Sequence, residues 1–212
     1  MHIPDGFVST PVAVTGIAVA AGSLTYAVKA TTRKMGEKHV PLMGVLAAFI
    51  FAAQMLNFPI IGGTSGHLLG AALAAILLGP WAGIITMTSI LIVQSLVFQD
   101  GGLLALGVNI VNMGVVPCLV GYYLYSGIAM LFRKHKTCIM IGGGLAGWLT
   151  VVVSAALCAL ELSASGIVPL KVALPAMSSI YALIGIVEGL ITAALLALVL
   201  SVRADLLALQ KT

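Results

Sequence analysis

Seven long apolar segments, separated by short polar loops, dominate this sequence of 212 residues. A membrane-spanning helix needs about 20 apolar residues. The segments that reach or approach this length lie at about 9–28, 41–58, 65–79, 81–98, 103–132, 138–160 and 172–200. Only 8% of the residues are charged, against roughly 25% in soluble domains. The sequence therefore predicts an all-α membrane protein, one domain over residues 1–212, with about seven transmembrane helices in the lipid bilayer.

The basic residues indicate the orientation of the chain. With seven crossings, nine of the ten Lys and Arg residues fall on one side, and only Lys171 falls on the other. The nine are Lys29, Arg33, Lys34, Lys38, Arg133, Lys134, Lys136, Arg203 and Lys211. The positive-inside rule then places the N-terminus outside and the C-terminus in the cytoplasm. This segregation explains the net charge of +4 without a nucleic-acid partner.

The outer N-terminus offers three nitrogen donors at one point. No positively charged region precedes the first apolar segment, so we expect the mature chain to begin at or very near Met1. The α-amine of Met1 and the amide nitrogen of His2 close a five-membered chelate ring, and the amide and imidazole Nδ1 of His2 close a six-membered one. In-plane nitrogen donors of this kind favour Ni(II) or Cu(II), whereas zinc prefers a tetrahedral site.

His67 is the best candidate for a fourth donor. It follows the glycine-rich outer loop centred on residues 62–66, whereas His39 and His135 lie in predicted cytoplasmic loops. We therefore expect the N-terminal segment 1–8 and the loop 59–67 to form a metal site with Met1, His2 and His67 as ligands. Asp5 is predicted to orient a ligand. On the residues alone, a second explanation accounts for the pattern about as well as a metal site does. In it, the histidine at position 2 is there by chance and His67 only hydrogen-bonds a helix end.

Other polar or small residues within the apolar segments admit two interpretations each. Five amides brace the ligands or join helices to one another: Gln54, Asn57, Gln94, Asn109 and Asn112. Glu188 is predicted to have a structural or a docking role. The row of small residues Gly44, Ala48 and Ala52 favours close helix packing, either on a partner protein or within the chain.

Two stretches resemble a known family. Residues 1–7 read MHIPDGF, and residues 62–70 read GGTSGHLLG. Both are similar to the NikM/CbiM family, the substrate-capture (S) components of energy-coupling-factor (ECF) importers for nickel and cobalt. The resemblance covers essentially the whole chain. It implies a seven-helix fold in which the amine of Met1, the amide and imidazole of His2 and the imidazole of His67 hold Ni(II) or Co(II). Residues 4–5 look more like the nickel branch.

The resemblance also implies a transport system in a prokaryotic plasma membrane. The implied partners of the chain are a transmembrane coupling (T) protein and two cytoplasmic ABC-type ATPases. The resemblance also allows for a small accessory membrane protein. The metal is then a transported substrate and not a cofactor. The sequence holds no GxxxxGK[ST] phosphate loop. We therefore expect a protein that is not an enzyme and whose energy comes from its partners.

Four alternatives belong to other classes or substrates. One is a Co(II)-specific S component for cobalamin supply. A stand-alone divalent-metal permease needs ionisable residues spaced across the membrane, and only Glu188 qualifies. A membrane metalloenzyme needs an open coordination position beside a general base. Vitamin capture by the same fold would not need Met1 and His2.

Overall fold

The structure is a computed structural model that describes residues 1–34, 40–56, 58–60, 64–132 and 135–203. Its helices are α1 (Thr10–Lys34), α2 (Val40–Gln54), α3 (Ala71–Leu78), α4 (Pro80–Val97), α5 (Leu106–Ile110), α6 (Val116–Leu131), α7 (Lys136–Ala164) and α8 (Leu170–Val202). A π-helix, η2 (Val111–Val115), joins α5 to α6 within one apolar segment. Each of the seven predicted segments thus contains helix, and the all-α prediction is confirmed.

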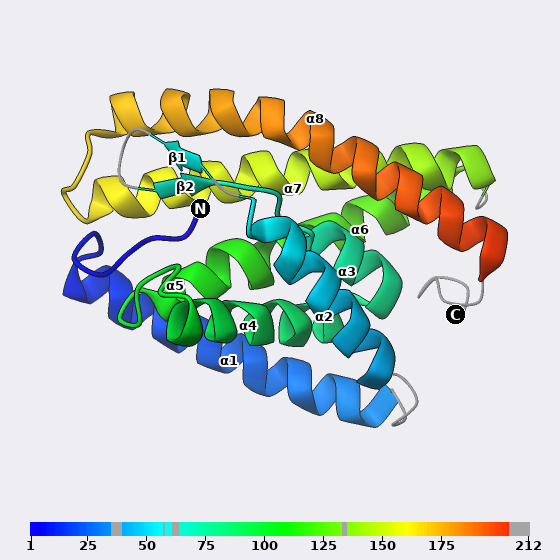
Figure 1. The fold of residues 1–212 in the computed structure, drawn as a ribbon, viewed down its shortest axis with the longest axis horizontal. Helices are drawn as coiled ribbons and strands as arrows, with labels where there is room; N and C mark the ends of the chain where they lie inside the picture. The colour runs from blue at the N-terminus through cyan, green and yellow to red at the C-terminus, as the bar shows by residue number, and fades with distance from the viewer. Residues whose placement is uncertain (35–39, 57, 61–63, 133–134, 204–212) are drawn as a thin grey trace.

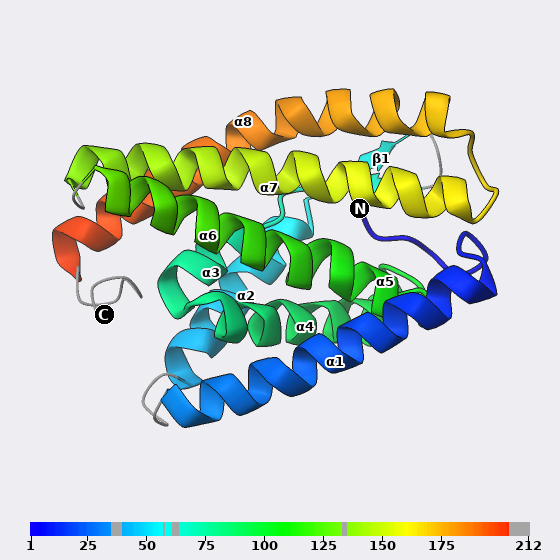
Figure 2. The ribbon, with the colours of Figure 1, turned by 180° about the vertical axis from the view of Figure 1, so that it is seen from behind.

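The helices form an elongated bundle in which the long ones run roughly lengthwise. In Figures 1 and 2, α7 and α8 lie side by side along one edge, and α1 lies along the opposite edge. Glycines let α7 and α8 approach closely, because a Cβ on Gly144 would lie 3.2 Å from the carbonyl oxygen of Gly189. Small residues allow such close backbone packing between membrane helices.

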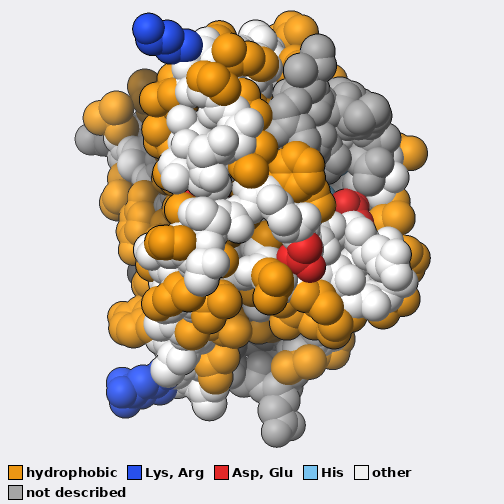
Figure 3. Space-filling view, turned by 90° about the vertical axis from the view of Figure 1, so that its left-hand side faces the viewer, with side chains coloured by type: hydrophobic (Ala, Val, Ile, Leu, Met, Phe, Trp, Pro, Cys, Tyr) orange, Lys and Arg blue, Asp and Glu red, His pale blue; other side chains and the backbone are white. Residues whose placement is uncertain are grey.

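Within the described residues, five helical segments are long and apolar enough to span a membrane: Thr10–Arg33, Pro80–Val97, Leu106–Leu131, Lys136–Ala164 and Leu170–Val202. The other two are shorter, with 15 residues in α2 and 8 in α3. Every residue of α3 is buried, so its length need not match the bilayer. Hydrophobic side chains cover much of the end of the bundle that Figure 3 shows, and few charged groups lie there. The chain is therefore a multi-pass membrane protein.

The predicted helices at 41–58 and 65–79 are wrong at the ends that face each other. Helix α2 ends at Gln54 and α3 begins at Ala71. Between them, the short strands β1 (Phe58–Ile60) and β2 (Thr64–Gly66) pair antiparallel. Pro59 and the glycines of this stretch disfavour a helix, because proline lacks an N–H and glycine gains backbone freedom outside a helix.

The row of Gly44, Ala48 and Ala52 on α2 is exposed on the outside of the bundle. A Cβ added at Gly44 would meet nothing within 4 Å. The interpretation of this row as packing within the chain is therefore wrong. Among the described residues, its surroundings leave it open to lipid or to another protein.

Candidate metal centre

Asp5 anchors the N-terminal segment to the start of α5. Its carboxylate accepts hydrogen bonds from the backbone N–H groups of Leu103 (3.1 Å), Leu104 (2.8 Å) and Ala105 (3.3 Å). These N–H groups lie just before the helix, where backbone donors lack partners within the helix and a carboxylate is favoured. Asp5 thus holds in place the segment that carries the predicted ligands Met1 and His2.

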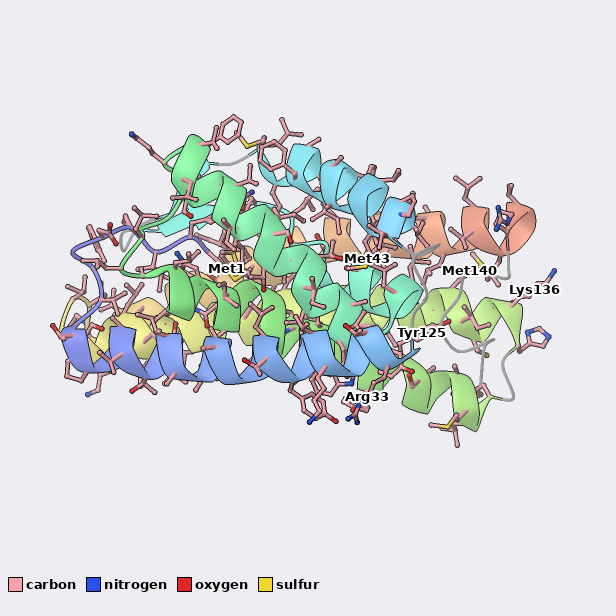
Figure 4. All side chains as sticks on the ribbon, turned by 90° about the horizontal axis from the view of Figure 1, so that it is seen from below. Met1, Arg33, Met43, Tyr125, Lys136 and Met140 are labelled. Carbon is pink, nitrogen blue, oxygen red and sulfur yellow. The ribbon has the colours of Figure 1, made fainter. Side chains whose placement is uncertain are left out.

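Asn109 on α5 holds the N-terminal segment at Ile3, two residues before Asp5. Its Oδ1 accepts from the backbone N–H of Ile3 at 2.9 Å, and its Nδ2 donates to the carbonyl of Ile3 at 3.0 Å. The backbone N–H of Gly102 donates to the same carbonyl at 2.9 Å. These contacts turn residues 1 and 2 into the interior, where Met1 is 0% and His2 3% exposed. Figure 4 shows Met1 between the helices, with Arg33 and Lys136 lying toward the other end.

The predicted donors Met1, His2 and His67 lie together. The α-amine nitrogen of Met1 is 2.9 Å from Nε2 of His67. The imidazole rings of His2 and His67 have centroids 4.6 Å apart. The amine also donates to the hydroxyl of Tyr181 on α8, at 2.7 Å. The Met1 amine and the rings of His2 and His67, from two distant parts of the chain, therefore lie together.

The hydrogen bonds of His67 determine its tautomer. Its Nδ1 lies 2.6 Å from the carbonyl oxygen of Leu68. A carbonyl can only accept, so Nδ1 carries the proton and donates. The unprotonated Nε2 then directs its lone pair toward the amine of Met1.

A relay of two glutamines determines the tautomer of His2. The relay starts at the Leu69 carbonyl, which accepts from Nε2 of Gln54 at 2.6 Å. Gln54 Oε1 then accepts from Nε2 of Gln94 at 2.9 Å, and Gln94 Oε1 faces Nε2 of His2 at 3.0 Å. Because that oxygen accepts, His2 Nε2 donates and Nδ1 keeps its lone pair. This is the nitrogen that the chelate requires.

Glu188 on α8 supports the turn that follows His67. Its two carboxylate oxygens accept from the backbone N–H groups of Leu69 (2.9 Å) and Gly70 (2.6 Å). Gly70 has a φ of +77° and lies so close to α2 that a Cβ there would be 2.7 Å from a methyl carbon of Ile50. Of its two predicted roles, Glu188 thus has the structural one, since it is 4% exposed.

Burial keeps the donors uncharged near neutral pH. It lowers the pKa of the Met1 amine from 8.0 to about 5. Burial, together with the neighbouring amine, lowers the pKa of His2 to about 4 and that of His67 well below its usual 6.5. A neutral amine and two neutral imidazoles have lone pairs ready for a cation.

The remaining predicted residues lie elsewhere, and one contributor was missed. Asn112 donates to Glu161 on α7 and not to a ligand, and Asn57 lies outside the described residues. Tyr181 was missed, because only its polar hydroxyl in an apolar helix marks it and nothing in its spacing points to residue 1. Within the described part of the chain, no three His, Cys, Asp or Glu side chains gather into a metal cluster. The predicted donor set differs from such a cluster, because two of its four nitrogens belong to the backbone.

Comparisons with known proteins place this architecture in one class. A crystal structure described as a transition metal transporter has a TM-score of 0.88 and 35% identity, covering 95% of this chain and 93% of its own. A relative from Archaeoglobus fulgidus, provisionally named fused nickel transport protein NikMN, is 43% identical over 209 residues, 98% of this chain and 68% of that protein. The cobalt transport protein CbiM of Geobacter sulfurreducens is 32% identical, over 98% of this chain and 62% of that protein.

The fold and these relatives define a multi-pass membrane protein of the metal transporter class. The family model described as "Cobalt uptake substrate-specific transmembrane region" (CbiM) matches residues 2–206. The chain belongs to the CbiM family.

Proposed function

We propose that this chain is the S component of an ECF-type importer that captures Ni(II), with Co(II) as a second substrate. The observation that carries the proposal is the 2.9 Å approach of the Met1 amine to Nε2 of His67. It brings the fourth nitrogen to the three that Met1 and His2 supply. The names of the nickel and cobalt relatives support the choice of metal.

The proposed ligands are the amine of Met1, the amide nitrogen and Nδ1 of His2, and Nε2 of His67. The two backbone donors are joined through only two carbon atoms, and the tautomers of both histidines leave Nδ1 of His2 and Nε2 of His67 unprotonated. A nitrogen set of this kind suits the square-planar preference of Ni(II). Zinc and magnesium are expected to compete poorly, since zinc prefers tetrahedral sites and magnesium prefers six oxygens.

The proposed system lies in a prokaryotic plasma membrane, with the metal centre on the outer side. The chain holds the ion, a coupling T protein receives it, and two cytoplasmic ATPases supply the energy. A small accessory membrane protein completes the set. The Archaeoglobus relative, of which this chain covers 68%, supports a further component because its name describes a fusion.

Titration of the purified protein with Ni(II) and with Co(II), followed by visible spectra, tests the proposal. Four in-plane nitrogens on a d8 ion produce a low-spin state, so we expect a yellow-orange, diamagnetic nickel complex of one ion per chain. A paramagnetic nickel complex with an octahedral spectrum would contradict the four-nitrogen centre. Binding of Co(II) with far higher affinity than Ni(II) would favour the cobalt-specific alternative.

The same titration at several pH values tests the state of the donors. Between pH 8 and 6 the amine and imidazoles are already unprotonated, because their pKa values lie at about 5, about 4 and well below 6.5. Only the amide proton is then released, so affinity should fall about tenfold per pH unit. It should fall more steeply below about pH 5, where the amine gains a proton.

Donors with ordinary pKa values would behave differently. An amine with its reference pKa near 8 would add roughly a fiftyfold loss between pH 8 and 6. A measured slope of two or more protons per metal in this range would therefore show that the donors are not buried and neutral before the metal binds.

A further inference from the structure

We infer that Asp100 provides the counter-charge of the metal centre: its carboxylate attracts the incoming ion at the rim and neutralises the loaded site without becoming one of the four ligands. This inference rests on the proposed function. It assigns a role to the loop between α4 and α5, in which the sequence predicts no ligand.

Asp100 faces the nitrogen that the chelate uses. Its Oδ1 lies 3.4 Å from Nδ1 of His2. The glutamine relay leaves Nδ1 as an acceptor, and a carboxylate oxygen is also an acceptor. At this distance a metal ion bound at Nδ1 would have the negative charge of the carboxylate beside it.

Asp100 also lies nearest to the solvent. Its side chain is 19% exposed, whereas that of His2 is 2% exposed, and Met1 and His67 are 0% and 1% exposed. An ion that approaches from outside therefore meets the carboxylate before it meets the nitrogens. Charges at the mouth of a low-dielectric cleft raise the rate of association with an oppositely charged ligand.

The backbone around Asp100 is arranged to hold it over His2. Its N–H donates to the carbonyl of Gln94 at 3.0 Å, and the side chain of that same Gln94 contacts His2. Gln99 is the only non-glycine residue with positive φ in the described part of the chain, at 55°. Such a conformation costs energy for a side chain other than glycine or asparagine and persists only where the surroundings impose it.

Gly101 provides room for this turn. Its φ is +95°, and a Cβ there would lie 3.0 Å from Asn109 and 3.4 Å from the ring of His2. The turn therefore packs directly on the residues that hold the N-terminal segment. Gln94 on one side and Gly101 on the other fix the position of the Asp100 carboxylate relative to the His2 imidazole.

The charges of the loaded centre balance only with a carboxylate. A divalent ion contributes two positive charges, the deprotonated His2 amide contributes one negative charge, and the amine and two imidazoles are neutral. One positive charge remains in a buried site, where an unpaired charge is strongly disfavoured. Asp5 and Glu188 each bind backbone N–H groups outside the centre, whereas Asp100 faces it and brings the sum to zero.

Stopped-flow mixing of Ni(II) with the full-length purified protein, followed by absorbance at low and at high ionic strength, tests this role. Asp100→Asn keeps the shape and removes the charge, and Asp100→Glu is the matched control that keeps the charge. We expect the Asn variant to associate about tenfold more slowly at low salt and to lose most of the salt dependence of the wild type. Its visible nickel spectrum should be unchanged, because the four nitrogens remain.

Several outcomes would overturn the assignment. One is an Asp100→Asn variant that keeps the association rate and the salt dependence of the wild type. Another is an Asp100→Asn variant whose nickel spectrum shifts, because that shift would show that Asp100 is a ligand. If the Asn variant binds no nickel, recovery of binding with the wild-type spectrum in Asp100→Glu supports the counter-charge, and loss of binding in both variants contradicts it. Failure of the wild type to bind nickel would instead contradict the proposed function.

Discussion

One extra residue before Met1 is expected to abolish tight nickel binding. The addition converts the α-amine into an amide and moves the new amine away from the buried position where the Met1 nitrogen contacts His67 and Tyr181. Met1 is 0% exposed, so the added residue has no space without displacing the segment. Affinity should fall by more than roughly a hundredfold, since even the outer partners of metal ligands are worth about 10–100-fold. Isothermal titration of nickel measures it.

Two substitutions test the same donors and should cause losses of different size. His2→Ala removes the imidazole and the six-membered chelate ring, so it should match the loss caused by the extension. His67→Ala leaves the three donors of residues 1 and 2 and should give a weaker but measurable site. A tag of equal length at the C-terminus is the control, and it should bind nickel like the untagged protein. An N-terminally tagged chain with the same affinity as this control would remove the amine from the centre.

Replacement of Ala48 by Leu is expected to block nickel uptake while nickel binding persists. Ala48 lies in the exposed row with Gly44 and Ala52 on α2, and its side chain contributes no ligand. Close approach of membrane helices depends on small residues, so a bulky side chain should keep the proposed T protein from docking there. Uptake would be measured in sealed vesicles that contain the chain, the coupling protein and the ATPases, with ATP.

The control for this experiment is Ala21→Leu, an equal increase in volume at an exposed position of α1. It should leave uptake and assembly unchanged. Normal uptake by Ala48→Leu would show that the docking surface lies elsewhere. The chain alone in vesicles should bind nickel without concentrating it, and accumulation without ATP would favour a stand-alone permease.

The sequence alone was enough to identify the class of protein and to predict the donors. Seven apolar segments with few charges leave a helical membrane protein as the only fold that solvates the chain. Covalent geometry alone brings the amine of Met1 close to the amide and imidazole of His2. The position of His67 after the glycine-rich outer loop adds the fourth donor, and the family resemblance implies the same residue. The class is confirmed because it depends on composition and local hydrophobicity. The donors, which depend on bonds between neighbouring residues, stay a prediction.

Only the tertiary structure showed how the predicted donors are arranged. The Met1 amine meets His67 across 66 residues and Tyr181 across 180, and Ile3 meets Asn109 across 106. The tautomer of His2 depends on a relay through Gln54 and Gln94. Local periodicity carries no information on such long-range contacts. For the same reason the sequence alone could not reveal the anchoring role of Asp5, the burial that leaves the donors neutral, or the position of Asp100 beside His2.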